Sequence, residues 1–369
     1  MKKHFKTILC LFLLVLFLAV GFVIFSNKTV EVNQEDVSFP KTKGNNLSLD
    51  QKIGQLFVIG VKGSVFDEEM AQLIKELHPG GVLLLKENIQ DIEQLKSLVN
   101  SLQEASLKDS GLSLFVAVDQ EGGIISRISW AESTPQSEIE DAEDAYRIGR
   151  ERAEELKELG INLILGPLAD AALKDDFIFE RSFKKDKETA SELAKGLISG
   201  QKEGGVLSCL KHFPGYGGIY FNPEDKLATL KEVPEISQFK TAAESSPEMV
   251  MISNVIYKEL DSKVLFSFLA NGIDFLKKEI PGDYLVVSDD LAQYSLLNNF
   301  STEEIVSKPF NAGVDLLIFS GWRIPVSNGV AWFKKAVGTG TVSLERIDSS
   351  LLKIIRMKEK LIIQNQNEN

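Results

Sequence analysis

From Gln55 onward, short runs of Val, Ile and Leu alternate eight times with longer segments whose apolar residues recur at helical spacing. Some of the short runs are apolar throughout, such as Val82–Leu85 and Leu316–Phe319, which is typical of parallel strands buried on both faces. Eight alternations over about 310 residues predict an α/β fold, a single-domain (β/α)8 barrel of the TIM type. A doubly wound open sheet is the alternative.

The boundaries of these elements follow from the apolar patterns. The predicted strands are Gln55–Val61, Gly80–Leu85, Leu114–Asp119, Asn162–Gly166, Val206–His212, Met249–Asn254, Tyr284–Asp289 and Val314–Phe319. The clearest predicted helices are Glu68–Leu77, Ile92–Leu107, Ala142–Leu159, Lys187–Glu203 and Leu344–Leu361.

The composition limits the kinds of partner and metal site that the protein can have. The 369 residues carry 41 Lys and Arg against 53 Asp and Glu, a net charge of −12, and they contain no basic stripe, so we expect no nucleic-acid partner. The two cysteines, Cys10 and Cys209, lie far apart and form neither a disulfide framework nor a zinc-binding spacing. We therefore expect no structural metal and no cofactor.

The N-terminus carries a membrane signal. Three lysines precede the uncharged run Ile8–Phe25, which at about 18 residues is long enough to cross a membrane as a helix. We predict an uncleaved signal anchor over residues 1–25, which makes this a single-pass cell-membrane protein with an extracytoplasmic C-terminal domain. The alternative is a cleaved signal peptide and a secreted protein, because Ala19-Val20-Gly21 offers a small-x-small cleavage site.

The remaining boundaries follow from polarity. Residues 26–47 are polar without apolar periodicity and are predicted to be a linker. The barrel is predicted over residues 48–363, starting at a capping box formed by Ser48 and Gln51, and residues 364–369 are predicted to be a frayed polar tail.

Chemistry in a barrel of this kind lies at the C-terminal ends of the strands. Polar stretches follow three of the predicted strands, at Asp119–Gly123, Lys211–Gly215 and Ser288–Asp290. Asp289 closes an apolar strand and should project into the mouth of the barrel. A carboxylate at that position can act as a nucleophile in covalent catalysis.

These stretches and three others resemble the family 3 glycoside hydrolases, specifically the single-domain β-N-acetylhexosaminidase branch. Six motifs in family order carry the resemblance: KIGQLF at Lys52–Phe57, GGVLLL at Gly80–Leu85, VDQEGG at Val118–Gly123, ERSF at Glu180–Phe183, KHFPG at Lys211–Gly215 and VSDDL at Val287–Leu291. The match covers roughly residues 49–362 and implies a retaining glycosidase acting on β-linked N-acetylhexosaminides, with cell-wall glycan as one candidate substrate.

The resemblance implies roles for individual residues. Asp289 corresponds to the family nucleophile. The positions implied to contact sugar hydroxyls are Asp119, Arg127, Arg181, Lys211 and His212.

Structural roles are the alternative for several of these residues. Arg127 and Arg181 could be salt-bridged rim residues, and His212 could be a buried structural histidine. We interpret Glu121 as bonding backbone within its Gly-Gly turn and Asp290 as a turn or capping carboxylate.

One loop departs from the family pattern. The family's general acid/base lies in an Asp-Ser-His stretch after KHFPGHG, but here Tyr216 replaces the second histidine of that motif, and the loop through Asp225 contains no histidine. Ungapped counting places Asn222 at the family aspartate and Glu224 at the family histidine. Asn254 also replaces a histidine commonly found at the end of the sixth strand.

Two hypotheses follow. In the first, the protein is a retaining glycosidase in which Glu224, or Asp225, replaces the histidine as acid/base. In the second, it is a carbohydrate-binding pseudoenzyme that has lost turnover. Retention of Asp289 favours the first, and loss of the histidine and aspartate favours the second. A phosphate-binding barrel enzyme is excluded because no Gly-rich loop follows the last two strands.

Overall fold

Eight parallel strands form a barrel in the computed structural model, which describes residues 46–321 and 323–367. Their order around the ring is β11-β9-β7-β6-β3-β2-β1-β12, so that neighbours in the chain are neighbours in the sheet. The strands are β1 (Phe57–Gly60), β2 (Gly81–Leu84), β3 (Phe115–Val118), β6 (Leu163–Ile164), β7 (Leu207–Phe213), β9 (Met249–Ile252), β11 (Leu285–Ser288) and β12 (Leu317–Phe319). The predicted (β/α)8 barrel is confirmed, with each strand lying where the apolar runs place it.

The seam between β11 and β12 closes the ring in an irregular way. The two strands share one parallel bridge, between Val287 and Leu316. Side chains supply further links here, because the Ser288 hydroxyl accepts a hydrogen bond from the Ile318 amide at 2.9 Å. The seam is therefore held partly by side chains rather than by a regular backbone ladder.

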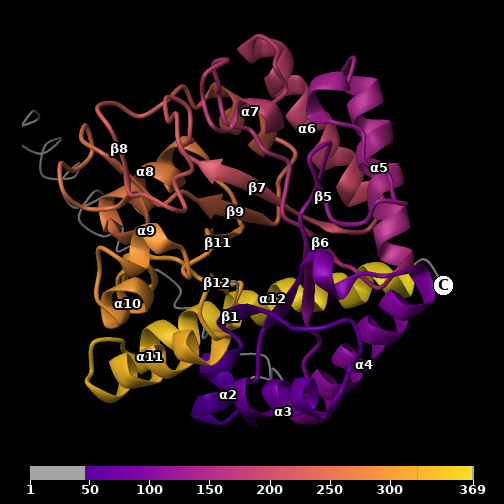
Figure 1. Ribbon diagram of the computed structural model, residues 1–369, viewed down its shortest axis with the longest axis vertical. Helices are drawn as coiled ribbons and strands as arrows, with labels where there is room; N and C mark the ends of the chain where they lie inside the picture. Colours follow the sequence, from indigo (N-terminus) through magenta and orange to yellow (C-terminus); the bar gives the residue numbers. More distant parts are fainter. Residues whose placement is uncertain (1–45, 322, 368–369) are drawn as a thin grey trace, which may run out of the picture. The chain divides into compact units, whose positions relative to one another are not determined.

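Helices surround the strands (Figure 1). They are α2 (Leu49–Gly54), α3 (Glu68–Leu77), α4 (Ile92–Ser110), α5 (Ala142–Glu158), α6 (Lys187–Glu203), α7 (Ser237–Ala243), α8 (Ala270–Glu279), α9 (Tyr294–Leu297), α10 (Thr302–Ala312), α11 (Val326–Gly338) and α12 (Leu344–Asn367). The short 3-10 helices are η2 (Lys86–Asn88), η3 (Gln136–Glu138), η4 (Phe179–Arg181) and η5 (Phe266–Phe268). The five predicted helices are present, and α12 continues beyond its predicted end at Leu361.

Local sequence signals explain several helix ends. Ser48 and Gln51 form the predicted capping box at the start of α2, with each side chain bonded to the other residue's backbone amide. Asp67, Asp91 and Asp186 cap α3, α4 and α6 by accepting from the third amide of each helix.

Two small sheets lie in loops that follow barrel strands. The hairpin β4 (Gln120–Gly122) and β5 (Ile125–Ser126) follows β3, and β8 (Ala228–Leu230) pairs with β10 (Val255–Tyr257) from the loops after β7 and β9. They add structure at the end of the barrel where chemistry is expected.

The predicted membrane segment lies outside the described residues, as does most of the predicted linker. Across 46–321 and 323–367, no helix combines the length and the apolar character needed to span a bilayer.

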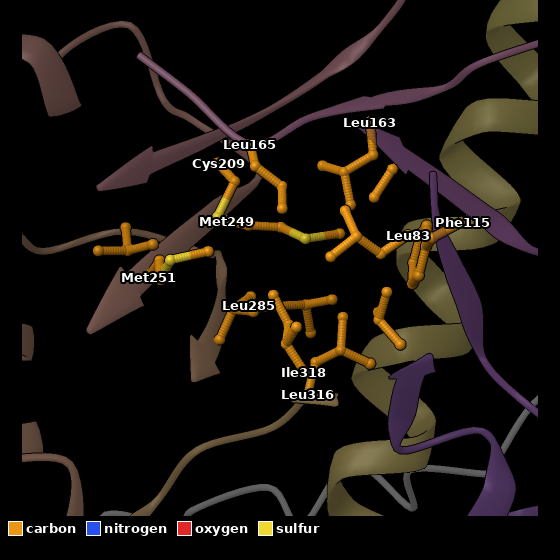
Figure 2. Close-up of a cluster of buried hydrophobic side chains, with 14 of the residues drawn as sticks. Leu83, Phe115, Leu163, Leu165, Cys209, Met249, Met251, Leu285, Leu316 and Ile318 are labelled. Carbon is orange, nitrogen blue, oxygen red and sulfur yellow. The ribbon is translucent and has the colours of Figure 1, made fainter. Parts of the chain in front are cut away.

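The barrel interior is filled by apolar side chains from the strands. Figure 2 shows these side chains directed toward one another, with Leu83, Leu163, Met249, Leu285 and Ile318 among those labelled. Cys209 belongs to the same cluster and is fully buried, and burial raises the pKa of its thiol to about 12. The interior is thus a packed core rather than a channel, as in other barrels of this type.

The packing between α12 and the barrel buries the amino group of a lysine. Lys358 of α12 is 2% exposed, and its Nζ donates to Gln55 Oε1 at 2.7 Å and lies 5.1 Å from the centre of the Phe115 ring. Burial lowers the pKa of Lys358 from 10.5 to about 7. The folded state is therefore less stable when Lys358 is protonated than when it is neutral.

This burial predicts a pH-dependent stability. Between pH 7 and pH 10.5 the unfolded chain binds more protons at this lysine than the folded chain, so wild-type stability should rise with pH relative to Lys358→Met. The slope should reach up to about 1.4 kcal/mol per pH unit, the value for one proton.

Denaturant unfolding at a series of pH values measures this difference. Lys360→Met removes an exposed lysine of the same helix and is the matched control. A difference between wild type and Lys358→Met that stays constant from pH 7 to 10 would contradict the prediction.

Candidate active site

A cavity of about 730 Å³ opens at the C-terminal ends of the barrel strands. Its floor is formed by Leu83, Leu165, Met251 and Ile318, which belong to the apolar cluster of Figure 2. Its polar lining includes every site residue predicted from the sequence: Asp119, Arg127, Arg181, Lys211, His212, Glu224 and Asp289. The structure therefore brings together residues that lie at or after the ends of four different strands.

A buried ammonium group organises one side of the cavity. Lys211 Nζ, at the end of β7, lies 2.9 Å from Asp119 Oδ1 and 2.5 Å from Glu121 Oε1. Arg127 Nη2 lies 3.4 Å from the other Asp119 oxygen. Burial alone would raise the pKa of Asp119, but Lys211 and Arg127 outweigh it and lower that pKa. Asp119 is consequently an ionised acceptor facing the cavity.

Glu121 forms a bidentate ion pair with Arg181, from the ERSF motif. The Nε–Oε2 and Nη2–Oε1 distances are 2.9 and 2.7 Å. Against the effect of burial, Arg181 and Lys211 hold the pKa of Glu121 well below its usual range. The interpretation of Glu121 as a residue that bonds turn backbone is wrong, because both of its oxygens are engaged by these two cations.

Another residue holds the turn backbone instead. Arg152 of α5 is buried, and its Nη1 donates to the carbonyl oxygen of Glu121 at 2.9 Å. Glycine is required at position 122, where φ is +96° and an added Cβ would lie 2.0 Å from the Thr134 oxygen. Sequence reasoning did not identify Arg152, because its helical periodicity alone gives no sign of its partner.

His212 is fixed by an aspartate that the sequence analysis missed. Asp170 Oδ2 accepts the His212 amide at 3.0 Å and lies 3.1 Å from His212 Nδ1. The other oxygen, Oδ1, accepts the Tyr216 amide at 2.6 Å. Asp170 lies just beyond the fourth predicted strand, so a wider search past each strand end would have found it.

Asp289 follows β11 and lines the cavity with both oxygens hydrogen-bonded. Oδ1 accepts the Asp290 amide at 2.7 Å, and Oδ2 accepts the Tyr216 hydroxyl at 2.5 Å. The backbone nitrogen of Asn254 lies 3.3 Å from that same hydroxyl oxygen. Tyr216 and Asn254, at two of the positions where the family pattern has histidines, thus meet beside Asp289.

Asp290 has contacts typical of a turn carboxylate. Its Oδ1 accepts the amides of Ala292 and Ser320 at 3.0 and 3.1 Å, and its Oδ2 accepts the Ser320 hydroxyl at 2.5 Å. These bonds fasten the end of β11 to the end of β12.

The two candidate acids on the loop after β7 have different surroundings. Glu224 lines the cavity, and its Oε2 lies 3.5 Å from Arg323 Nη2, whereas the Asp225 carboxylate pairs with the same nitrogen at 2.7 Å. Arg323 Nη1 also donates to the Glu224 carbonyl oxygen at 3.1 Å, and its guanidinium stacks 4.3 Å from the Tyr294 ring centre. Partial burial, together with the negative charges of Asp289 and Asp290, raises the pKa of Glu224 to about 7.

A second cavity of about 770 Å³ lies beside the first, around the ends of β1 and β12. Leu85, Glu87 and Ser320 line both cavities, so the two meet. Within the described part of the chain, no cluster of three or more His, Cys, Asp or Glu residues is arranged to hold a metal ion.

Comparisons with known proteins agree with this geometry. The model of the glycosyl hydrolase family 3 N-terminal domain matches residues 48–357. A β-hexosaminidase from Neisseria meningitidis serogroup B is 30% identical over 271 residues, which are 68% of this chain and 74% of that protein. β-Hexosaminidase A from Pseudoalteromonas piscicida is 29% identical over 340 residues, covering 79% of this chain but 55% of that protein, so the chain spans about half of that relative's length.

Solved structures share the fold. A family 3 β-N-acetylglucosaminidase from Paenibacillus superposes with a TM-score of 0.80 at 26% identity, covering 86% of this chain and 63% of that chain. A β-N-acetylhexosaminidase from Beutenbergia cavernae superposes with a TM-score of 0.78 at 23% identity, covering 85% and 99%. The six motifs and these comparisons agree, and the chain belongs to glycoside hydrolase family 3.

Proposed function

We propose that this protein is a retaining glycosidase that hydrolyses β-linked N-acetylhexosaminides. Asp289 is the nucleophile and Glu224 is the general acid/base. The relatives named as β-hexosaminidases support the substrate class. The observation that carries the mechanism is the position of Glu224, a carboxyl group with a pKa raised to about 7 in the same cavity as Asp289.

The two carboxyl groups divide the chemistry. Asp289 attacks the anomeric carbon and forms an ester, while protonated Glu224 gives its proton to the departing glycosidic oxygen. Glu224, now ionised, then takes a proton from water, and that water breaks the ester and releases Asp289. The Glu224 side chain is 52% exposed, so water can reach it for the second step.

Substrate recognition is assigned to the charged cluster. Asp119 offers acceptor oxygens to sugar hydroxyls, and Arg127, Arg181, Lys211 and His212 offer donors. The adjoining second cavity leaves room for the group on the far side of the scissile bond, so glycans longer than one sugar are suitable substrates, including cell-wall glycan.

A carbohydrate-binding pseudoenzyme is the second candidate. The observation that favours it is the loop between Tyr216 and Asp225, which lacks the family histidine. The two candidates differ in one measurement, because a pseudoenzyme binds N-acetylglucosaminides without turnover. An assay of the fragment from Ser48 onward on an aryl N-acetyl-β-glucosaminide, with binding measured in parallel, distinguishes them.

The first prediction for the mechanism concerns the nucleophile. Asp289→Asn should retain fold and sugar binding but lower kcat by a factor on the order of 10⁴ to 10⁶, because an amide cannot form the glycosyl ester. Steady-state kinetics and sugar binding by calorimetry measure both properties. An unchanged kcat would remove Asp289 from the mechanism.

The second prediction concerns the acid. Glu224→Ala should slow substrates with poor, alkoxide-like leaving groups by about 10²- to 10⁴-fold and spare glycosylation from activated aryl glycosides. Added azide should speed its second step, since an anionic nucleophile needs no general base. In wild type, turnover of poor leaving groups should fall as pH rises through about 7, where Glu224 loses its proton.

Asp225→Ala is the matched control, because Asp225 lies next in the same loop but forms the closer ion pair with Arg323. It should retain the wild-type preference between leaving groups. If Asp225→Ala instead shows the leaving-group dependence and azide rescue, the acid is Asp225.

We also propose that the catalytic domain lies outside the cytoplasm, held at the cell membrane by residues 1–25. The charge and apolar pattern of that segment and a relative named as a secreted glycosyl hydrolase support an extracytoplasmic location.

Full-length protein should then stay in the membrane fraction after a high-salt wash, with its C-terminal domain accessible to protease from outside. N-terminal sequencing of the recovered protein provides the opposing outcome: a soluble form beginning near Phe22 would identify a cleaved signal peptide.

A further inference from the structure

The hydroxyl of Tyr216 lies between the backbone amide of Asn254 and the carboxylate of Asp289. Tyr216 is 4% exposed, and its ring centre lies 4.8 Å from that of His212. Its amide is held by Asp170, and its hydroxyl lies 2.5 Å from Asp289 Oδ2. The tyrosine is therefore anchored at both ends.

The direction of this hydrogen bond is fixed by a second contact. The Asn254 backbone N–H lies 3.3 Å from the Tyr216 oxygen and can only donate. The phenol oxygen accepts there, which leaves its single hydrogen for Asp289. Burial and the negative charge of Asp289 raise the pKa of Tyr216 well above its ordinary value, so the phenol remains a donor.

We propose that Tyr216 holds the Asp289 carboxylate in place and stabilises it as the leaving group when the glycosyl-enzyme breaks down. This inference rests on the proposed function, in which Asp289 is the nucleophile. Tyr216 acts on the sugar only through Asp289 and is thus a positioning residue. It occupies a position where the family pattern has a histidine.

The charge on Asp289 changes in opposite directions in the two steps. When Asp289 attacks, its negative charge is lost into the ester, and a hydrogen bond from Tyr216 weakens. When water attacks, the bond between the anomeric carbon and the Asp289 oxygen breaks, its electron pair returns to the carboxylate, and the water proton goes to Glu224. The hydrogen bond from Tyr216 strengthens in this second step, because hydrogen bonds to charged groups are the stronger ones.

Tyr216→Phe should therefore affect the two steps differently. With an activated aryl N-acetylglucosaminide, the rate of glycosyl-enzyme breakdown should fall by roughly 10- to 100-fold, the size expected for a hydrogen bond to a charged group. The rate of its formation should not fall, since the lost bond stabilises the starting carboxylate more than the ester. Rapid mixing should show a burst of released aryl group, and acid quenching should trap a sugar ester on the peptide that contains Asp289.

Tyr257→Phe is the matched control. Tyr257 is also buried, and its hydroxyl donates at 2.6 Å to the carbonyl oxygen of Gly215, the residue before Tyr216. This hydroxyl does not contact Asp289. Thermal unfolding of both variants measures the cost of losing a buried hydroxyl. Tyr257→Phe should lower stability without increasing the amount of trapped ester.

The outcomes separate this inference from the function on which it rests. If wild type forms the ester at Asp289 but Tyr216→Phe slows both steps equally, or behaves as Tyr257→Phe does, the role of Tyr216 is overturned and the proposed function stands. If wild type forms no ester at Asp289 and Asp289→Asn remains active, both are overturned. An increased ester population in Tyr216→Phe alone supports the inference.

Discussion

The ion pairs around Lys211 are the interaction on which the polar part of this molecule depends. A single ammonium, 3% exposed, contacts carboxylates from two places in the chain, Asp119 at the end of β3 and Glu121 in the hairpin beyond it. Without it, Asp119 would keep only its 3.4 Å contact with Arg127 and Glu121 only its ion pair with Arg181, and removing one partner of a buried charge network is strongly destabilising. The apolar interior ends where this network begins. The same charges that complete the fold also provide the donors and acceptors that face the cavity.

The sequence was sufficient for the fold and for the location of the site, because both depend on local patterns. Apolar runs are readable one strand at a time, and barrel topology places their C-terminal ends in one mouth. Asp119, Lys211 and Asp289 could be found in this way.

Interactions between distant segments were not predictable by the same reasoning. Glu121 was interpreted from its neighbours in a Gly-Gly turn, yet its partner Arg181 is 60 residues away. Asp170 serves His212 and Tyr216 from a different loop. Asp289 and Tyr216 are separated by 73 residues, and nothing in the local sequence of either indicates the other. The structure also distinguishes two adjacent acids, because Glu224 lines the cavity while Asp225 forms the shorter contact with Arg323, which follows β12.

The seam between β11 and β12 has a consequence for how this domain tolerates mutation. Most neighbouring strands are joined by several backbone pairs, which no side-chain replacement removes. This junction instead combines one backbone bridge and nearby backbone hydrogen bonds with contacts from the hydroxyls of Ser288 and Ser320 and the carboxylate of Asp290. Side-chain replacements can therefore weaken this junction, whereas they leave the ladder hydrogen bonds elsewhere in the ring in place. Because Asp289 lies between Ser288 and Asp290, side-chain replacements at this seam would also disturb the Asp289 carboxylate, which lines the cavity.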